Sequence, residues 1–447
     1  MTTPVKDFIQ NYIDSHCIRA HMPGHKGREL LGFEKYDITE TDGADVLYAA
    51  TGILAESMNN AASLFGTEKT VYSAEGSSLS IRAMLYLCTL YAKKKGVRTH
   101  ILAGRNAHKV FVMSAALLDT DVTWLYGKGG GITGCDITAS ELDKILSDME
   151  NKPCAVYITS PDYLGNIADI RGIAKVCEKH NLLLIVDNAH GAYLNFLSEN
   201  QHPIHLGAHI CCDSAHKTLP ALTGAGYLHI SKKAPPIFSE NAVKAMTLFA
   251  STSPSYLILQ SLDAVNGYLS DGYREKLSGY CKKTARLSER LADIGIKNIS
   301  KEPLKLTFAP KEYGYTGIAL AAYLKECGIV CEFYDPDYTV LMLTPESEDD
   351  ALERIYNAMS ALPKKDKIYE KPPCINAAKV GMSIRDAVFA PTEKIPLCES
   401  YGRIYAGICA SCPPAVPVAV CGEIIDNDTI DLLRYYGEET VDAVTEY

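Results

Sequence analysis

The stretch Leu182-Leu-Leu-Ile-Val-Asp-Asn-Ala-His-Gly191 decides the fold class of this 447-residue chain. Its first five residues are apolar in succession, which is typical of a strand that is buried on both faces of a parallel sheet. Asp187 follows directly, at the carboxyl end of the strand, where open α/β sheets bind their ligands. Because a carboxylate at such a point also caps turns, the stretch predicts the sheet and leaves the role of Asp187 open.

Similar apolar runs alternate with helical patterns from about residue 46 to residue 230, which predicts a mostly parallel α/β sheet. The strands that we expect are 99–103, 155–159, 182–186, 209–212 and 227–230. The helices that we expect between them include 78–95 and 170–180. The fold class is therefore α/β.

A smaller α+β domain is expected after this sheet. A long helical stretch at 255–294 leads out of the sheet. Short strands are expected beyond it, at 304–308, 329–333 and 340–343. We predict three parts: an N-terminal arm (1–45), a large domain (46–270), and a connector helix with a small C-terminal domain (271–447).

The composition, with 47% apolar and 22% charged residues, is that of a soluble globular protein. The net charge of −10 argues against a nucleic-acid partner and is compatible with a cationic substrate. Charged Lys6, Asp7 and Asp14 stand where a secretory signal is apolar. Three prolines interrupt the longest uncharged stretch, 404–422, so we interpret it as a buried loop and strand rather than a membrane span. We expect a cytoplasmic protein.

The fifteen cysteines predict no metal site. A C-x-x-C pair at Cys409 and Cys412 is followed only by the lone Cys421, whereas a zinc site needs a second pair at suitable spacing. We expect buried thiols in a reducing compartment.

Lys217 lies in a second polar stretch, Asp213-Ser-Ala-His-Lys-Thr218, directly after the expected strand 209–212. It comes thirty residues after Asp187, about one strand–helix–strand unit, which brings it to the same edge of the sheet. Burial near other cations lowers the pKa of a lysine and makes its amine a nucleophile toward carbonyl groups. An exposed loop lysine is the alternative reading of this stretch by itself.

Glu75-Gly-Ser-Ser-Leu-Ser80 opens the expected helix 78–95. Small and hydroxyl residues at a helix N-terminus expose backbone N–H groups to an anion. Ser77 or Ser78 is also a suitable N-cap residue, a role that is compatible with binding a phosphate at the same turn.

His108 follows the expected strand 99–103, in Arg105-Asn-Ala-His-Lys109. A histidine at this position can stack on an aromatic ligand, although a lone loop histidine usually does not. An anion cradle, a ring partner, a strand-end carboxylate and a lysine then follow one another on consecutive βα units. This is the set that a phosphorylated pyridine aldehyde requires.

These motifs resemble the ornithine/lysine/arginine decarboxylase family of pyridoxal-phosphate (PLP) enzymes, which has the aspartate-aminotransferase (type I) fold. The chain is similar to the compact bacterial form of that family. The resemblance runs over nearly the whole chain, through HMPGHKG at 21–27, DITETDGADVL at 37–47, EGSS at 75–78, RNAHK at 105–109, TSPDYLGNIADI at 159–170, VDNAHGA at 186–192, DSAHKTLPALTGAG at 213–226, STSPSYLILQSLDA at 251–264 and PPAVPVAVCGE at 413–423.

The resemblance assigns the reactive end of the cofactor. It implies that Lys217 is the Schiff-base lysine, that Asp187 pairs with the pyridine nitrogen, and that His190 lies near the phenolic oxygen. It implies that His108 stacks on the ring. We therefore expect Lys217, His108, Asp187 and His190 to be the catalytic residues, without a metal.

The resemblance also assigns the cofactor phosphate and the partner subunit. The implied phosphate ligands are Ser77, Ser78, Ser214 and His216, and Gly76 is a further implied cofactor-binding residue. Thr252 resembles a contact that the neighbouring subunit supplies, which implies a homodimer with shared active sites and allows a higher oligomer.

The expected reaction is decarboxylation of a basic L-amino acid (arginine, lysine or ornithine) to its amine, in polyamine-related metabolism. Glu332 and Asp335 are candidate partners for the cationic tail of the substrate, and solvated surface acids are their alternative reading. An aminotransferase or lyase of the same fold is the first rival function. The second is a silent paralogue that acts as a binding partner.

Three departures from the family pattern bear on these expectations. The family usually has Asn at the position of Glu75, and an anion there disfavours a phosphate unless it points away. The usual P-P-G-I-P reads P-P-A-V-P here, with Ala415 in place of the glycine. Gly224 replaces a common Gln.

Overall fold

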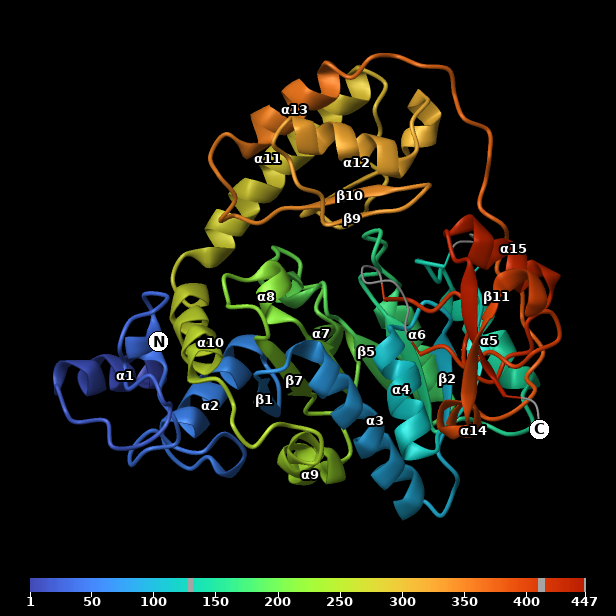
Figure 1. Ribbon diagram of the computed structural model, residues 1–447. Helices are drawn as coiled ribbons and strands as arrows, with labels where there is room; N and C mark the ends of the chain where they lie inside the picture. Colours follow the sequence, from blue (N-terminus) through green and yellow to red (C-terminus); the bar gives the residue numbers. More distant parts are fainter. Residues whose placement is uncertain (128–131, 409–414, 446–447) are drawn as a thin grey trace. The chain divides into compact units, whose positions relative to one another are not determined.

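The computed structural model describes residues 1–127, 132–408 and 415–445 (Figure 1). The chain folds into two compact units, each made of two segments. Unit 1 comprises Met1–Val97 and Ile170–Lys276, and unit 2 comprises Arg98–Asp169 and Leu277–Tyr447. The boundaries that we expect near residues 45 and 270 remain predictions.

Four strands form the sheet of unit 1, in the order β1-β7-β6-β5. They are β1 (Lys69–Ser73), β5 (Leu183–Asp187), β6 (Ile210–Asp213) and β7 (Gly226–Ile230). Strands β5 and β6 are parallel, with Asp187 opposite Cys212, whereas β7 is antiparallel to both of its neighbours. The expected strands 182–186, 209–212 and 227–230 are confirmed to within a residue. Strand β1 was not expected, because only two of its five residues are apolar.

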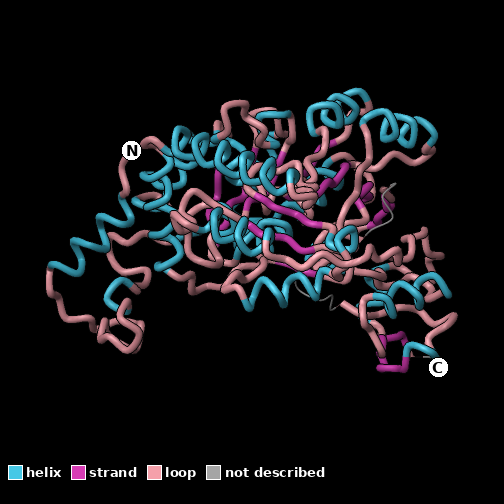
Figure 2. The backbone as a smooth tube through the Cα atoms, turned by 90° about the horizontal axis from the view of Figure 1, so that it is seen from above, coloured by secondary structure: helices cyan, strands magenta, loops and turns pink. Residues whose placement is uncertain are grey.

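The helices of unit 1 include the expected α3 and α6. They are α1 (Pro4–Asp14), α2 (Ile53–Phe65), α3 (Gly76–Lys94), α6 (Ile170–Lys179), α7 (Pro203–Leu206), α8 (Ala215–Thr218), α9 (Pro236–Thr247) and α10 (Tyr256–Leu269). Between α1 and α2 the arm is mainly loop, with two short 3-10 turns (Figure 2). Buried Asp263 in α10 anchors the arm, since its Oδ2 accepts hydrogen bonds from the N–H groups of Val5 and Lys6 at the start of α1.

The long helix that we expect at 255–294 is two helices, α10 and α11 (Tyr273–Asp293). They are separated at residues 270–272, where Gly272 adopts a positive φ of 69°. A residue in the left-handed region ends a helix, and glycine is the residue that reaches this region without strain. The prediction of one continuous helix was therefore wrong at this point.

Three parallel strands belong to the first segment of unit 2, in the order β4-β2-β3. They are β2 (His100–Gly104), β3 (Asp121–Leu125) and β4 (Ala155–Thr159), with helices α4 (Lys109–Leu118) and α5 (Ala139–Asp148) between them. The prediction of strands at 99–103 and 155–159 is confirmed. Strand β3 lies at the edge of the sheet and is partly exposed, so it lacks the apolar run of a buried strand.

The second segment of unit 2 forms the small α+β part that the sequence predicts. Strands β8 (Lys305–Phe308), β9 (Phe333–Tyr334) and β10 (Thr339–Met342) form an antiparallel sheet in the order β8-β10-β9. Helices α11, α12 (Gly317–Glu326) and α13 (Ala351–Ser360) lie together on it (Figure 1), with a shared core that includes Leu291, Phe308 and Leu324. Of the expected strand 329–333, only Phe333 is in a strand.

The C-terminal part of unit 2 contains a strand pair, β11 (Thr392–Pro396) with β12 (Thr440–Val444), and the helices α14 (Ile384–Phe389) and α15 (Asn427–Tyr435). Where the structure describes the stretch 404–422, it is mostly buried loop, with isolated bridges at Ile404 and Tyr405 instead of a strand. The C-x-x-C pair lies outside the described residues. No helix within 1–127, 132–408 or 415–445 is long and apolar enough to cross a membrane.

Arg105 holds the loop that carries the altered C-terminal motif. Its guanidinium donates hydrogen bonds to the carbonyl oxygens of Pro417 and Val418, both at 2.8 Å. The carbonyl oxygen of Ala415 accepts a hydrogen bond from the N–H of Lys109, at the first residue of α4, at 2.7 Å. Ala415 has a φ of +56°, in the left-handed region, so this position favours the glycine that the family motif has.

We expect Ala415→Gly to raise the free energy of unfolding by about 1 kcal/mol, because glycine removes the cost of a left-handed alanine. Ala419→Gly in the same loop is the matched control, since Ala419 is buried and does not have a positive φ. The control should lower stability. Urea denaturation of both variants measures the change in the free energy of unfolding. A loss of stability in Ala415→Gly would contradict the conclusion that Ala415 is strained in the left-handed region.

Candidate active site

The strand ends of unit 1 carry three of the predicted residues, Asp187, His190 and Lys217. Asp187 is the last residue of β5, and Lys217 lies in the short helix α8 that follows β6. The Nζ atom of Lys217 is 3.0 Å from Nε2 of His190, in the loop after Asp187. Residues that are 27 positions apart in the chain therefore form one amine–imidazole pair.

The Asp187 carboxylate is enclosed, with the residue only 2% exposed. Its Oδ1 atom accepts hydrogen bonds from the N–H of Ala189 at 3.1 Å and from Sγ of Cys212 at 3.5 Å. Both donors fix the direction of the carboxylate. A buried carboxylate in this position is suited to hold a protonated ring nitrogen.

The N-terminus of α3 meets α8 at a pair of hydroxyl groups. Ser214, directly after β6, donates a hydrogen bond from Oγ to Oγ of Ser77, at 2.9 Å. Ser78 is next along the first turn of α3 and is partly exposed. The structure therefore places three hydroxyl residues at the positive end of a 19-residue helix.

Glycines allow the backbone to close around this turn. Gly76, the first residue of α3, has a φ of +65°. A Cβ added at Gly226 would lie 2.8 Å from the carbonyl carbon of Gly76, so no side chain fits there. His216 completes the turn, with Nδ1 at 2.8 Å from the carbonyl oxygen of Ala225, which fixes the orientation of the imidazole.

Glu75, the residue that departs from the family pattern, is exposed, and its carboxylate is engaged by another segment. Its Oε1 atom accepts a hydrogen bond from the N–H of Ser251 at 2.7 Å. Thr252, the predicted contact to a partner subunit, is the next residue and is exposed. Glu75 therefore holds the start of the segment that the resemblance gives to the dimer contact.

We expect Glu75→Gln to change the dissociation constant of PLP by less than about fivefold, since an exposed charge interacts with a nearby anion by less than about 1 kcal/mol in water. The amide oxygen of Gln also remains able to accept from Ser251. Titration of the apoprotein with PLP, followed by absorbance, measures the constant, with exposed Glu68→Gln as the control. A gain in affinity of tenfold or more would show that the carboxylate opposes the phosphate.

The remaining predicted residues belong to unit 2. His108 is the N-cap of α4, and its Nδ1 accepts a hydrogen bond from the N–H of Val110 at 3.1 Å. Glu332 accepts a hydrogen bond from the Tyr163 hydroxyl at 3.3 Å. Asp335 is buried in a turn, where its Oδ1 accepts from the N–H groups of Asp337 and Tyr338, and burial raises the pKa of its carboxyl to about 6.

The sequence reasoning missed a buried network on Asp213. Asn188 donates to its Oδ1 at 2.7 Å, and Nε2 of His202 lies 3.0 Å from its Oδ2. His229 Nε2 is 3.3 Å from the same oxygen. Burial alone raises the pKa of this carboxyl, but the two imidazoles outweigh it and hold the pKa well below its usual range. The available signal in the sequence was that Asp213 ends a buried strand four residues before Lys217.

The comparisons with known proteins identify the family. A model of the Orn/Lys/Arg decarboxylase major domain matches residues 3–293. The arginine decarboxylase of Bacillus subtilis is 25% identical over 464 residues, covering 96% of this chain and 93% of that protein. The arginine decarboxylase of Halalkalibacterium halodurans is 26% identical, covering 97% and 93%.

A solved structure shows the same fold. The constitutive lysine decarboxylase of Escherichia coli aligns with a TM-score of 0.76 at 17% identity, over 99% of this chain and 82% of that one. The α/β fold is thus the type I fold of PLP enzymes, as the resemblance implies. From the family match and from the lysine, carboxylate and hydroxyl residues at the strand ends, we conclude that the chain belongs to the Orn/Lys/Arg decarboxylase family of PLP-dependent decarboxylases.

Proposed function

We propose that this enzyme decarboxylates a basic L-amino acid (arginine, lysine or ornithine) to the corresponding amine and CO2, in polyamine-related metabolism in the cytoplasm. The observation that carries the proposal is the Lys217–His190 pair, together with the buried carboxylate of Asp187 at the end of β5. The relatives named arginine decarboxylase support a basic substrate, and the chain's net charge of −10 is compatible with a cationic one.

The residues of unit 1 fit PLP as the cofactor. The Ser77 and Ser214 hydroxyls at the start of α3 suit a phosphate, because the N-terminus of a helix favours an anion. Ser78, Gly76 and His216 are the further residues that we assign to this phosphate site. Lys217 suits the aldehyde and Asp187 the ring nitrogen. When bound, PLP supplies a sink for the electron pair of the bond that breaks at Cα.

The side chains then have separate tasks. Lys217 is the nucleophilic amine, and His190, 3.0 Å away, is placed to take or return its proton. Asp187, a buried carboxylate with fixed orientation, would pair with the ring nitrogen and favour its protonated form. After CO2 leaves, Lys217 or His108 delivers a proton to Cα. His108 is assigned to the ring face from the resemblance.

The cationic tail of the substrate needs an acidic partner. Glu332 and Asp335 remain our candidates from the sequence. Glu332 is partly exposed and has the Tyr163 hydroxyl as its donor, whereas one oxygen of Asp335 is occupied by its own turn.

We also propose a homodimer with shared active sites, in which Thr252 contacts the cofactor of the partner subunit. Exposed apolar side chains on the N-terminal arm support a partner that covers them. Those that are more than half exposed are Met1, Ile18, Met22, Leu30 and Leu31.

Product analysis tests the proposed reaction. Purified enzyme with PLP is incubated separately with L-arginine, L-lysine and L-ornithine, and CO2 and the released amine are identified. We expect one of the three to yield its amine in equal amount to CO2. A keto acid in place of the amine would assign an aminotransferase. Absence of turnover together with absence of PLP binding would favour a silent binding partner.

A further inference from the structure

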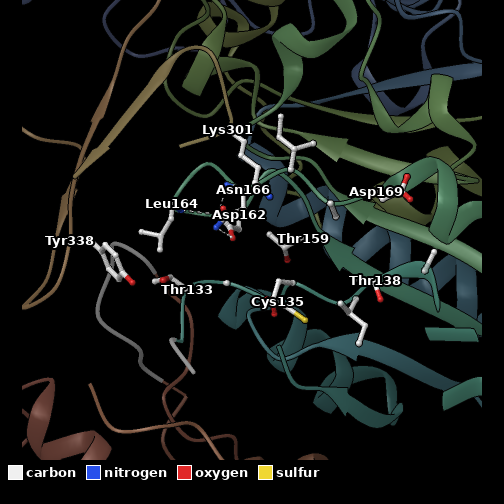
Figure 3. A pocket seen from close by; sticks show the side chains of 16 residues that line it. Thr133, Cys135, Thr138, Thr159, Asp162, Leu164, Asn166, Asp169, Lys301 and Tyr338 are labelled. Atoms are coloured by element: carbon white, nitrogen blue, oxygen red, sulfur yellow. Dashed lines mark hydrogen bonds between the residues drawn. The ribbon is translucent and has the colours of Figure 1, made fainter. Parts of the chain in front are cut away.

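Unit 2 contains a pocket of about 510 Å³, which we call the Thr159 pocket. Its size is within the range of small-molecule sites. Thr159 is the last residue of β4, and the loop 133–136 that lines the other side follows β3, so the pocket opens at the carboxyl ends of parallel strands. Figure 3 shows it lined by Thr133, Cys135, Thr159, Asp162, Lys301 and Tyr338.

The charge of the Thr159 pocket favours a cation. Among the residues that the structure describes, three carboxylates line it, those of Asp136, Asp162 and Asp169, against one ammonium group, that of Lys301. Lys301 is exposed, so water screens its charge, whereas Asp162 is only 4% exposed.

Asp162 is fixed in place before any ligand arrives. Its Oδ1 accepts the N–H groups of Leu164 and Asn166, and its Oδ2 accepts Nδ2 of Asn166, all at 2.9 Å (Figure 3). A Cβ added at Gly134 would be 3.2 Å from that Oδ2, so the loop 133–136 closes tightly over it. Burial removes water from the Asp162 carboxylate and raises the pKa of the carboxyl group. A bound cation would stabilise the charged carboxylate and so offset this cost of burial.

The hydroxyl group of Thr159 points to a ligand independently of charge. Its oxygen is shielded from solvent and has no hydrogen-bond partner among the described residues. A shielded polar atom without a partner costs about 1–3 kcal/mol, which a ligand N–H donor would recover. Asp162 and Thr159 together present acceptors to a donor-rich cation.

We propose that the Thr159 pocket binds the ammonium or guanidinium end of an aliphatic amine, with Asp162 as its counter-charge and Thr159 as a hydrogen-bond acceptor. The lining of the pocket indicates a cationic ligand. That this ligand is an aliphatic amine rests on the proposed function. Two sources share this chemistry: the tail of the basic substrate, and a separate amine molecule such as the reaction product.

Calorimetric titration of the PLP-loaded protein with putrescine, cadaverine and agmatine tests the proposal. We expect saturable binding of at least one amine, weakened about tenfold or more in Asp162→Asn through loss of a charged hydrogen bond. Thr159→Val keeps the shape of the side chain and removes no hydrogen bond within the described residues, so it should fold normally and still weaken binding. Thr392→Val, at an exposed position of β11, is the matched control.

Inhibition kinetics separate the two sources. If the pocket takes the substrate tail, the amine competes with the amino acid and Thr159→Val raises KM more than it lowers kcat. If the pocket takes a separate amine, inhibition is non-competitive and KM is unchanged. Either pattern of inhibition supports amine binding in the Thr159 pocket. Failure of all three amines to bind, or unchanged affinity in both variants, overturns it, while amine binding without decarboxylation rejects the proposed function alone.

Discussion

Lys217→Ala should remove the absorbance band of the bound cofactor near 420 nm and lower decarboxylation by at least about 10³-fold. The variant deletes the amine that lies 3.0 Å from His190, and alanine offers no group that reacts with an aldehyde. Spectra of the PLP-treated protein and the rate of CO2 release are the two measurements.

Exposed Lys232→Ala is the matched control for this substitution, and it should keep both the band and the rate. If the 420 nm band persists in Lys217→Ala, another lysine holds the cofactor and the assignment of the site is wrong.

Asp213→Ala should lower the free energy of unfolding by about 3–5 kcal/mol, which is the usual effect of removing one partner of a buried charged network. The substitution leaves Asn188, His202 and His229 without the carboxylate that they share. All three side chains are fully buried, so water does not replace the lost hydrogen bonds. Urea denaturation measures the effect.

The exposed Asp349→Ala is the control for Asp213→Ala and should stay within about 0.5 kcal/mol of the parent protein. We also expect weaker PLP binding in Asp213→Ala, because Asp213 directly precedes Ser214 and is hydrogen-bonded to Asn188, the neighbour of Asp187. A stability equal to that of the control would mean that the histidines and Asn188 find other partners.

The elements that the sequence predicted well are the buried ones. Strands β4, β5, β6 and β7 are apolar runs, and such runs have few alternatives in a folded protein. Strands β1 and β3 were missed, since polar residues interrupt them. The break at Gly272 was missed because a helical pattern continues on both sides of it.

The local motifs determined the chemical types of the site: a lysine and an aspartate at strand ends, and hydroxyl residues at the start of α3. The resemblance then assigned their roles, and the family match supports the class of enzyme. Motifs carry this information because the carboxyl ends of parallel strands lie at one edge of the sheet, so short-range patterns fix which side chains gather there.

Only the tertiary structure decided which groups touch. It paired Lys217 with His190, joined Ser77 to Ser214, directed Glu75 to Ser251, and enclosed Asp213 between two histidines. It also placed Asp162 and Thr159 in one pocket. The sequence by itself determined the fold class and the residue types, because these depend on local periodicity. Contacts between distant residues depend on how strands and loops pack, and that is set by the whole chain.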